Sequence, residues 1–441
     1  MVLIRAAMVL ALALGSGARA DEAGEDPVLY RYTGTPGARP SGVLVDGADG
    51  RIAALQQAVN LVLLACGFEG GIDADGMFGR QTQRAIRQVA SCPPIAARLP
   101  AGSAARDGAV THALWAVLLP GQPVPDARTR SRALLLAFEG TDITAGAVWN
   151  FCQNNRTLYD PGADDPTCYS NDPASYLTWG PNGATAGHGH EILSILARIE
   201  ALDPGLLDAD FGSEAPAVRR MLDLRIEFGD DSELQRYLCG IYVDFPRRSQ
   251  WSAGFARLGQ RTEVQALYRA VYDSATFDGG KMRTFVEAWR DAGLEPTEID
   301  HAFFADRAAH TRVRNVEVRR LLRRVMAALP ADPHPALVRR GFARAARVSN
   351  PAQRSARLGR DVTFYIDALE DRLTRAERHA WEARGGRRAE AVGLSDERPA
   401  PEVRVGPRDP FRATGLRPLT PAEAAQCPAP VLNPRRPPAR S

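Results

Sequence analysis

The sequence predicts a mainly α-helical protein with a small β element in its middle third. Over most of the chain, apolar residues recur at the three- and four-residue spacing of helices. Strand signals are few outside one glycine-rich stretch, residues 179–191. A chain of 441 residues with an ordinary apolar content, 45%, is long enough to form two or three globular domains.

The N-terminal residues 1–20 have the pattern of a secretory signal peptide. Arg5 precedes a short apolar run, and the small-x-small pattern at residues 18–20 predicts cleavage before Asp21. The alternative is an uncleaved anchor, for which the apolar run is shorter than a membrane-spanning helix. No later stretch is long and apolar enough to cross a membrane. We therefore expect an exported protein of the periplasm or the extracellular space.

Charge and cysteine content narrow the expected partners and chemistry. The formal net charge is only +3, which gives no reason to expect binding to nucleic acid. Export permits disulfides, and the six cysteines are Cys66, Cys92, Cys152, Cys168, Cys239 and Cys427. Proximity favours pairing the first with the second and the third with the fourth, which leaves the fifth with the sixth, although other connectivities stay open. No cysteine or histidine pair has zinc-ligand spacing, so we expect no metal site and no cofactor.

Residues 46–120 form the first predicted module. A linker rich in glycine, proline and aspartate, residues 21–45, precedes it. Apolar spacing predicts helices over residues 51–65 and 81–89, and a polar, glycine-bearing turn at residues 72–79 separates them. A third helix follows near the end of the module. The expected product is a small three-helix unit.

Several residues of this module form a known pattern. They are Leu55, Gln56, Gly67, Phe68, the run Ile72-Asp73-Ala74-Asp75-Gly76-Met77-Phe78-Gly79, Thr82, Leu114 and Trp115. The module resembles the three-helix peptidoglycan-binding domains of bacterial proteins, and the resemblance implies wall binding in which Asp73, Asp75 and Phe78 take part. The family's second helix normally has a longer Phe-Gln ending, which residues 88–92 lack. The alternative is a helical spacer with a buried aromatic pair.

The second predicted module covers residues 128–310 and begins with an apolar helix that delivers Glu139. Gly140 follows directly, and glycine just past a helix end is a common stop signal because it adopts the left-handed conformation without strain. At the lip of a packed helix the carboxyl group of Glu139 is partly desolvated, which raises its pKa. A general acid for glycoside cleavage needs such a pKa. The alternative is an ordinary carboxylate at a helix end.

The glycine-rich stretch at residues 179–191 predicts a hairpin that opens into a helix. Its core is the run Gly183-Ala184-Thr185-Ala186-Gly187-His188-Gly189-His190. Together with Phe138-Glu139-Gly140, this run resembles the phage-type lysozymes and the wider lysozyme-like superfamily, including the hairpin of secreted chitosanases. The resemblance implies a mostly helical domain with a small β-hairpin, with Glu139 as the acid and Thr185 helping to hold a water.

The sequence also departs from that family. The family spacing between the Glu and the Thr is much shorter, so residues 150–176 form an apparent insertion. The family aspartate has no clear counterpart: Asn150 stands nearest to its place, and the chitosanase aspartate would fall at Gly180. The general base is therefore unassigned.

Four further residues of this module are candidates for substrate binding. Trp149 and Trp179 are either core residues or platforms on which a sugar ring stacks. Asn182 either bonds an acetamido group or suits the backbone of its turn. His188 and His190 are two residues apart, so at most one faces a substrate if the segment is extended, and we assign His188 to that role.

The rest of the chain is predicted to be helical up to about residue 390. Helical spacing continues after residue 192 to the end of the second module and through an arginine-rich extension, residues 311–390. The arginines either form a solvated face or are weakly attracted to anionic wall polymers or lipid headgroups. Residues 391–441 are rich in proline and arginine, and we expect most of this tail to be unstructured.

These features lead to one main functional hypothesis. The chain is expected to be an exported, peptidoglycan-degrading glycosidase that cuts the glycan strand with Glu139 as general acid. One alternative is a lytic transglycosylase, in which the muramyl 6-hydroxyl closes a ring and no base is needed. Another is a non-catalytic lysozyme-like scaffold that binds peptidoglycan, and a chitosanase is a third.

Overall fold

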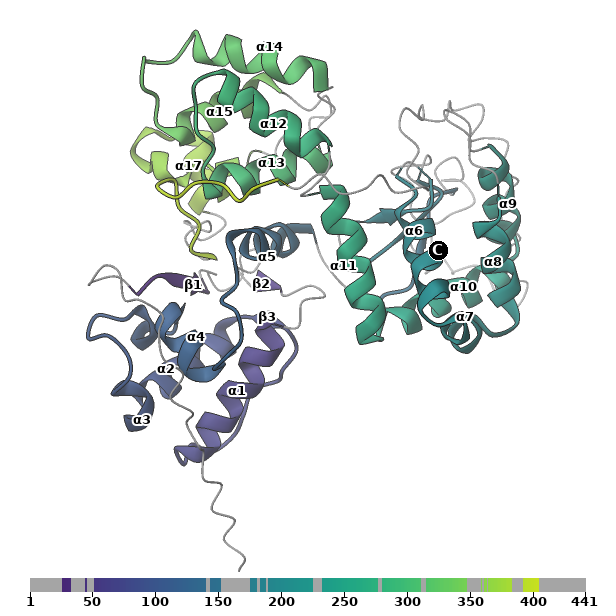
Figure 1. The fold of residues 1–441 in the computed structure, drawn as a ribbon, viewed down its shortest axis with the longest axis horizontal. Helices are drawn as coiled ribbons and strands as arrows, with labels where there is room; N and C mark the ends of the chain where they lie inside the picture. The colour runs from purple at the N-terminus through teal and green to yellow at the C-terminus, as the bar shows by residue number, and fades with distance from the viewer. Residues whose placement is uncertain are drawn as a thin grey trace, which may run out of the picture.

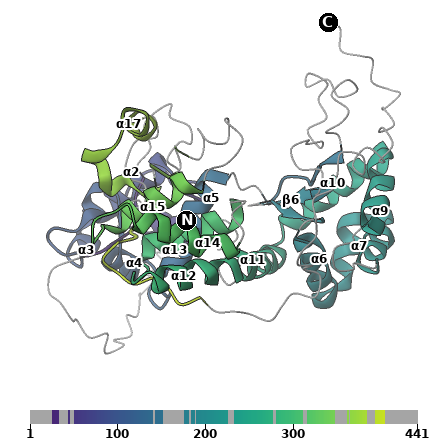
Figure 2. The ribbon, with the colours of Figure 1, turned by 90° about the horizontal axis from the view of Figure 1, so that it is seen from above.

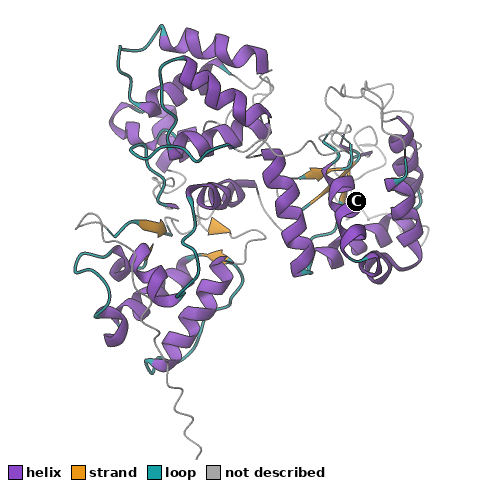
Figure 3. Cartoon of the chain, in the orientation of Figure 1, coloured by secondary structure: helices purple, strands orange, loops and turns teal. Residues whose placement is uncertain are grey.

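The computed structural model describes most of the chain. The described residues are 26–32, 44–45, 51–139, 143–151, 175–180, 183–187, 189–224, 232–276, 280–310, 315–346, 358, 361–362, 364–382 and 392–403. At the ends of some elements, among them residues 136–139, the description covers the backbone alone. Within these residues the protein is mainly helical with a few short strands, which confirms the predicted class (Figure 3).

The N-terminal part contains the three predicted helices. Its elements are α1 (Arg51–Ala65), α2 (Arg80–Ser91), α3 (Pro93–Ala96), the 3-10 helix η1 (Ala104–Asp107), α4 (His112–Leu118), β1 (Val28–Tyr30), β2 (Leu44–Val45), β3 (Met77–Phe78) and β4 (Val110–Thr111). The strands form two antiparallel pairs, β1 with β4 and β2 with β3. Sequence patterns did not predict these strands because two or three residues are too few to show an alternation.

Helix α5 (Ala127–Glu139) lies between the N-terminal part and the C-terminal helices (Figure 1). It packs on α13 (Glu298–His310). Buried residues from both ends of the chain therefore form one cluster, which we call the first core: it runs from Leu29 to Leu134 and from Met282 to Leu394.

The C-terminal helices surround α13. They are α12 (Gly280–Asp291), α14 (Asn315–Met326), α15 (Pro335–Ala345), the 3-10 helix η5 (Asp367–Arg372) and α17 (Arg375–Glu382). The arginine-rich extension is thus helical where it is described. Arg319 of α14 donates to Asp291 (2.7 Å) and Glu287 (3.1 Å) of α12. Part of its arginine face is therefore neutralised by contacts with α12.

The beginning of the predicted unstructured tail is ordered, which corrects that expectation for residues 392–403. The Glu298 N–H donates to the Arg398 carbonyl (3.0 Å), and the Ala400 N–H donates to the Pro296 carbonyl (2.8 Å). Asp396 accepts from the buried guanidinium of Arg339 at 2.7 Å. Backbone pairing and a buried charge thus hold a segment that its composition alone would leave in solvent. Residues 404–441 lie outside the described part of the chain.

The remaining elements build a second core, which runs from Ile143 to Val271. They are β5 (Val148–Trp149), β6 (Leu177–Trp179), β7 (Ala184–Thr185), α6 (Glu191–Leu202), α7 (Pro204–Phe211), the 3-10 helix η4 (Gly212–Glu214), α8 (Ala215–Leu222), α9 (Ser232–Val243), α10 (Phe245–Gly259) and α11 (Thr262–Thr276). Figures 1 and 2 show this group of elements beside the rest of the molecule. Helix α11 is the member of the group that lies nearest to the other elements. The module boundaries expected from the sequence stay predictions.

Candidate functional site

The predicted hairpin is present and belongs to a three-stranded antiparallel sheet in the order β5-β6-β7. Thr178 pairs with Val148 on one side and with Thr185 on the other. Because side chains alternate along a strand, the sheet has two unlike faces. One face packs into the second core and carries Trp149, Leu177, Trp179 and Ala184, all buried.

The opposite face of the sheet carries Val148 of β5, Thr178 of β6 and Thr185 of β7, and Asn150 extends it directly after β5. Asn150, directly after β5, donates from Nδ2 to Thr178 Oγ1 of β6 at 2.7 Å. Thr178 stands opposite Thr185 of β7, and both threonines are half-buried. The Asn150 Oδ1 is buried and accepts no hydrogen bond within the described residues. We call Asn150, Thr178 and Thr185 the polar sheet face.

Thr185 is the most highly connected residue of this face. Its hydroxyl lies 2.8 Å from the Gly187 carbonyl and 3.1 Å from Glu191 Oε2, and it accepts from the Gly189 N–H at 3.2 Å. Its backbone N–H donates to the same Glu191 oxygen at 3.2 Å. The glycine-rich loop therefore closes on Thr185, and Glu191, the first residue of α6, returns to hold it.

Beneath the hairpin, Tyr268 of α11 supports the same loop from inside the core. Its hydroxyl donates to the Trp179 carbonyl at 2.9 Å and accepts from the Ala184 N–H at 3.3 Å. Burial raises the pKa of Tyr268 well above its usual range, and the nearby Glu191 adds to this effect. The phenol thus stays protonated at neutral pH and keeps both bonds to the hairpin.

Glu139 is the last residue of α5, as the apolar run and Gly140 predict. Its side chain lies outside the described part, so its contacts stay predictions. Ile143, four residues later, is buried, and its carbonyl accepts from the Trp179 indole N–H at 3.2 Å. Four residues span at most about 14 Å. The end of α5 is therefore joined to the sheet by a short connection: Ile143 contacts Trp179 of β6, and β5 itself begins at Val148.

The two tryptophans proposed for substrate binding are core residues in this structure. Trp149 is 0% exposed and Trp179 is 1% exposed. The Trp149 indole donates to Ser252 Oγ at 3.2 Å, and the Trp179 ring meets Tyr268 edge to face. Neither ring offers a free face for a sugar here, which favours the core alternative over stacking.

The other proposed binding residues are less well placed by the structure. Asn182 and His188 lie outside the described residues. His190 is buried, adopts a left-handed backbone conformation with φ 56°, and donates its N–H to the Gly187 carbonyl at 2.7 Å. It closes the loop directly before α6.

In the first module, the glycine-bearing turn is held by Gln56 of α1, which is 1% exposed. Its side-chain oxygen accepts from the Gly76 N–H (2.9 Å), and its amide donates to Asp75 (2.9 Å) and to the Met77 carbonyl (3.1 Å). Phe78 is fully buried, whereas Asp73 is exposed. Of the three residues proposed for wall binding, Asp75 and Phe78 therefore have roles within the fold: Asp75 bonds Gln56, and Phe78 is part of the first core.

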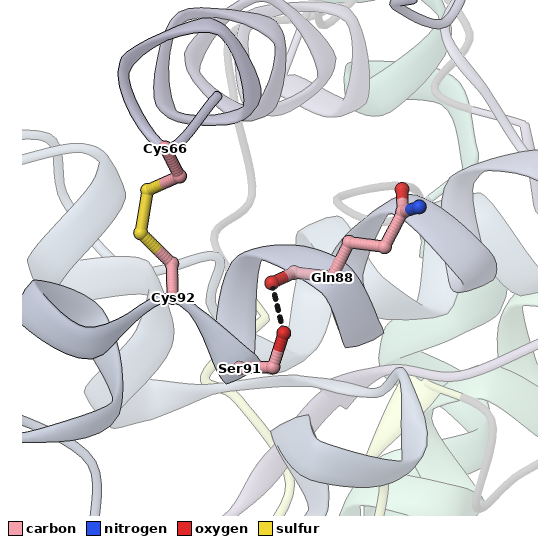
Figure 4. The surroundings of a disulfide bond; sticks show 4 residues. All are labelled: Cys66, Gln88, Ser91 and Cys92. Atoms are coloured by element: carbon pink, nitrogen blue, oxygen red, sulfur yellow. Dashed lines mark hydrogen bonds between the residues drawn. A yellow bond between two sulfur atoms is a disulfide. The ribbon is translucent and has the colours of Figure 1, made fainter. Parts of the chain in front are cut away.

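The expected pairing of the first two cysteines is present. Cys66, just after α1, is bonded to Cys92, just after α2 (Figure 4). Beside it, the Ser91 hydroxyl donates to the Gln88 carbonyl at 2.7 Å. Cys239 is also disulfide-bonded. Cys152, Cys168 and Cys427 lie outside the described residues, so the other two pairings stay predictions.

Glu191 is the residue that reading the sequence missed. A glutamate on the first turn of a helix is common, and its sequence neighbours gave no reason to connect it with Thr185. Its return contact depends on Gly189, where a Cβ atom would collide with the Glu191 carboxylate. Gly189, between Thr185 and Glu191 in sequence, was the one local sign that a side chain packs closely against this loop.

Comparisons of the chain with family models, with curated proteins and with solved structures found no match. Within the described ranges, no three histidine, cysteine, aspartate or glutamate side chains gather as metal ligands would. Among the helices that the structure describes, none combines the length and apolarity that a membrane crossing requires.

Proposed function

We propose that this protein is an exported glycosidase that degrades peptidoglycan, with Glu139 as the general acid. The observation that carries the proposal is the short connection between the end of α5 and the sheet that carries Thr185. The helix that ends at Glu139 is joined through Ile143 and Trp179 to the hairpin whose outer face carries Thr185. Glycoside cleavage needs an acid and a bound water at one bond, and we assign these roles to the end of α5 and to the hydroxyl of Thr185.

The role of the acid is chemically specific. Glu139 protonates the glycosidic oxygen while the sugar ring gains oxocarbenium character. Thr185 contributes hydrogen bonds rather than charge, because its hydroxyl has one proton and two lone pairs, and one lone pair is already used by the Gly189 N–H. The second lone pair is available to a water on the polar sheet face.

The remaining features of the proposal come from the sequence. Residues 1–20 direct export to the periplasm or beyond, and the N-terminal module binds the glycan strands of the wall. The basic C-terminal region adds at most a weak attraction to anionic wall or membrane surfaces, since Arg319 is already paired with α12.

The test is mass spectrometry of the soluble products released from purified sacculi by the wild type and by Glu139→Gln. Muropeptides with reducing ends, absent from the variant, are the expected result. Wild-type lysis by Glu139→Gln would refute the assignment. Glu263→Gln, the same change at an exposed position of α11, serves as the matched control and should release the same products as the wild type.

Two alternatives predict different results in the same experiment. A lytic transglycosylase releases anhydro-muramyl ends, again lost in Glu139→Gln. A non-catalytic scaffold binds sacculi and releases nothing. One feature of the sequence favours the scaffold: the family aspartate has no clear counterpart, and the residue nearest to its place is Asn150, an amide that cannot serve as a base.

A further inference from the structure

The geometry points to Glu191 as the missing second carboxylate of the site: we infer that it takes the proton from the water that attacks the sugar. This inference rests on the proposed function. It assigns the general base to a residue of this chain that neither the motif nor the position of the family aspartate would select.

The Glu191 carboxylate lies beside the hydroxyl to which we assign water binding. Glu191 Oε2 lies 3.1 Å from Thr185 Oγ1. Both bonds between Glu191 and Thr185 use Oε2, so within the described residues Oε1 is left to accept from a water bound beside the Thr185 hydroxyl. A general base must meet this geometric condition before any other, and Thr185 is the residue to which water holding was assigned.

The Glu191 side chain is partly exposed, and no cation is paired with it among the described residues. Glu191 is half-buried, so solvent and substrate can reach its carboxylate. Within the described part of the chain, no arginine or lysine forms an ion pair with it. It stands on the first turn of α6, where the positive end of the helix dipole stabilises a negative charge. The charge is thus held without a cation that would block the carboxylate.

The loop before α6 packs closely against the Glu191 carboxylate. Any side chain at Gly189 would collide with it, and the Gly189 N–H at the same time donates to Thr185. The carboxylate accepts from the backbone N–H of Thr185 and lies 3.1 Å from its hydroxyl, whose single proton is also in range of the Gly187 carbonyl at 2.8 Å. Its position is therefore fixed by several contacts rather than left to rotamer freedom.

The reaction balances with these two carboxyl groups. The water oxygen bonds to the anomeric carbon, and the water proton passes to Glu191. The bond from the anomeric carbon to the glycosidic oxygen breaks, and Glu139 gives its proton to that oxygen. The anomeric configuration inverts, and exchange with solvent restores the two protonation states.

The test uses the full-length protein and purified sacculi. Glu191→Gln keeps an oxygen that can accept from Thr185 but cannot take a proton. We expect product release to fall about 100-fold or more while sacculus binding and thermal unfolding stay close to wild type. Glu200→Gln, which removes a carboxylate from the far end of the same helix, is the matched control and should retain wild-type release.

A second readout separates a base from a merely structural carboxylate. In Glu191→Ala, added azide should restore part of the bond cleavage and give a glycosyl azide of inverted configuration, because the small anion attacks without needing a base. A structural role would not produce this product.

Several outcomes would overturn the inference. If Glu191→Gln kept most of the wild-type release, Glu191 would not be the base, and the proposed function would still stand. Anhydro ends from the wild type would remove the need for any base. Loss of folding in both Glu191→Gln and Glu191→Asp would assign the carboxylate to structure. No products from the wild type would refute the function and the inference together.

Discussion

Two threonines in this molecule are held by a carboxylate in nearly the same way. In the second core, Glu191 Oε2 accepts from the Thr185 N–H and lies 3.1 Å from its hydroxyl. In the C-terminal helices, Glu377 Oε2 accepts from the Thr374 N–H (2.8 Å) and its hydroxyl (2.9 Å). The second pair is a capping box at the start of α17, in which the Glu377 N–H also donates to Thr374 Oγ1.

The surroundings of the two carboxylates differ. The Glu377 side chain is 3% exposed and is paired with Arg340 and Arg344 of α15. Burial opposes its ionisation, but the hydrogen bonds from Arg340 and Thr374 dominate together and lower the pKa of Glu377 to about 2. Glu191 is half-buried and has no such cation among the described residues.

The same contact between a glutamate and a threonine can therefore serve stability in one place and a reaction in another. A carboxylate that is enclosed and neutralised by two arginines can contribute only to stability, because nothing can reach it. A carboxylate that holds a threonine at a half-exposed loop keeps a path to solvent. The predictions that follow test this contrast, starting with the largest expected effect.

Gly189→Ala should abolish most of the activity while leaving the fold intact. The added Cβ displaces the Glu191 carboxylate, which ends a flexible side chain and can move aside once its contacts with Thr185 are broken. Gly189 has no positive φ, so alanine adds no backbone strain. We expect a loss of about 100-fold or more in product release.

The control for that variant is Gly240→Ala in α9, where an added Cβ meets open space. It should keep full activity. The double variant of Gly189→Ala with Glu191→Gln should be no less active than either single variant, because both remove the same interaction. Additive losses would separate Gly189 from Glu191 and contradict the proposed coupling.

Glu377→Gln should show the opposite pattern, with lower stability and wild-type activity below its melting temperature. A pKa lowered from 4.5 to about 2 corresponds to about 3 kcal/mol of stabilisation. Urea unfolding followed by circular dichroism measures the loss. Unchanged stability in Glu377→Gln would show that the enclosed carboxylate contributes nothing, and the contrast with Glu191 would fail.

The pH dependence of stability should reveal the same group. Because the folded pKa of Glu377 lies below its unfolded value, its contribution is complete above about pH 4.5 and is lost as the pH falls towards 2. The slope attributable to one group is at most about 1.4 kcal/mol per pH unit. Unfolding curves of the wild type should converge with those of Glu377→Gln at the acidic end of this window.

Thr374→Ala should have the smallest effect of the four. It removes the capping hydroxyl of α17 but leaves the ion pairs of Glu377 with Arg340 and Arg344 in place. We expect a loss of about 1 kcal/mol in the free energy of unfolding. A loss as large as that of Glu377→Gln would mean that the hydroxyl, and not the charge, supplies most of the stability.

Local patterns predicted much of the secondary structure. The apolar run before Gly140 gave α5 its correct end at Glu139, and the glycine-rich stretch gave the hairpin of β6 and β7 and the start of α6. These features depend on residues close together in sequence, whose conformations are set by apolar spacing and by glycine. Proximity in sequence likewise predicted the Cys66–Cys92 disulfide.

Patterns failed where distant segments meet. The ordered segment at residues 392–403 has the composition of a tail, and its order comes from pairing with α13 and from the contact of Asp396 with Arg339. Trp179 was equally compatible with core or surface, because an aromatic residue in a glycine-rich stretch gives no sign of which side of the sheet will be covered.

Local spacing and turn residues were enough to predict the helical class, the position of Glu139 at a helix end and the hairpin that carries Thr185. Three features emerged only from the packing of distant segments: the shared first core, the burial of one face of the sheet, and the return of Glu191 to Thr185. The physical reason is that burial and side-chain contacts depend on which surfaces pack together, and a linear pattern does not contain that information.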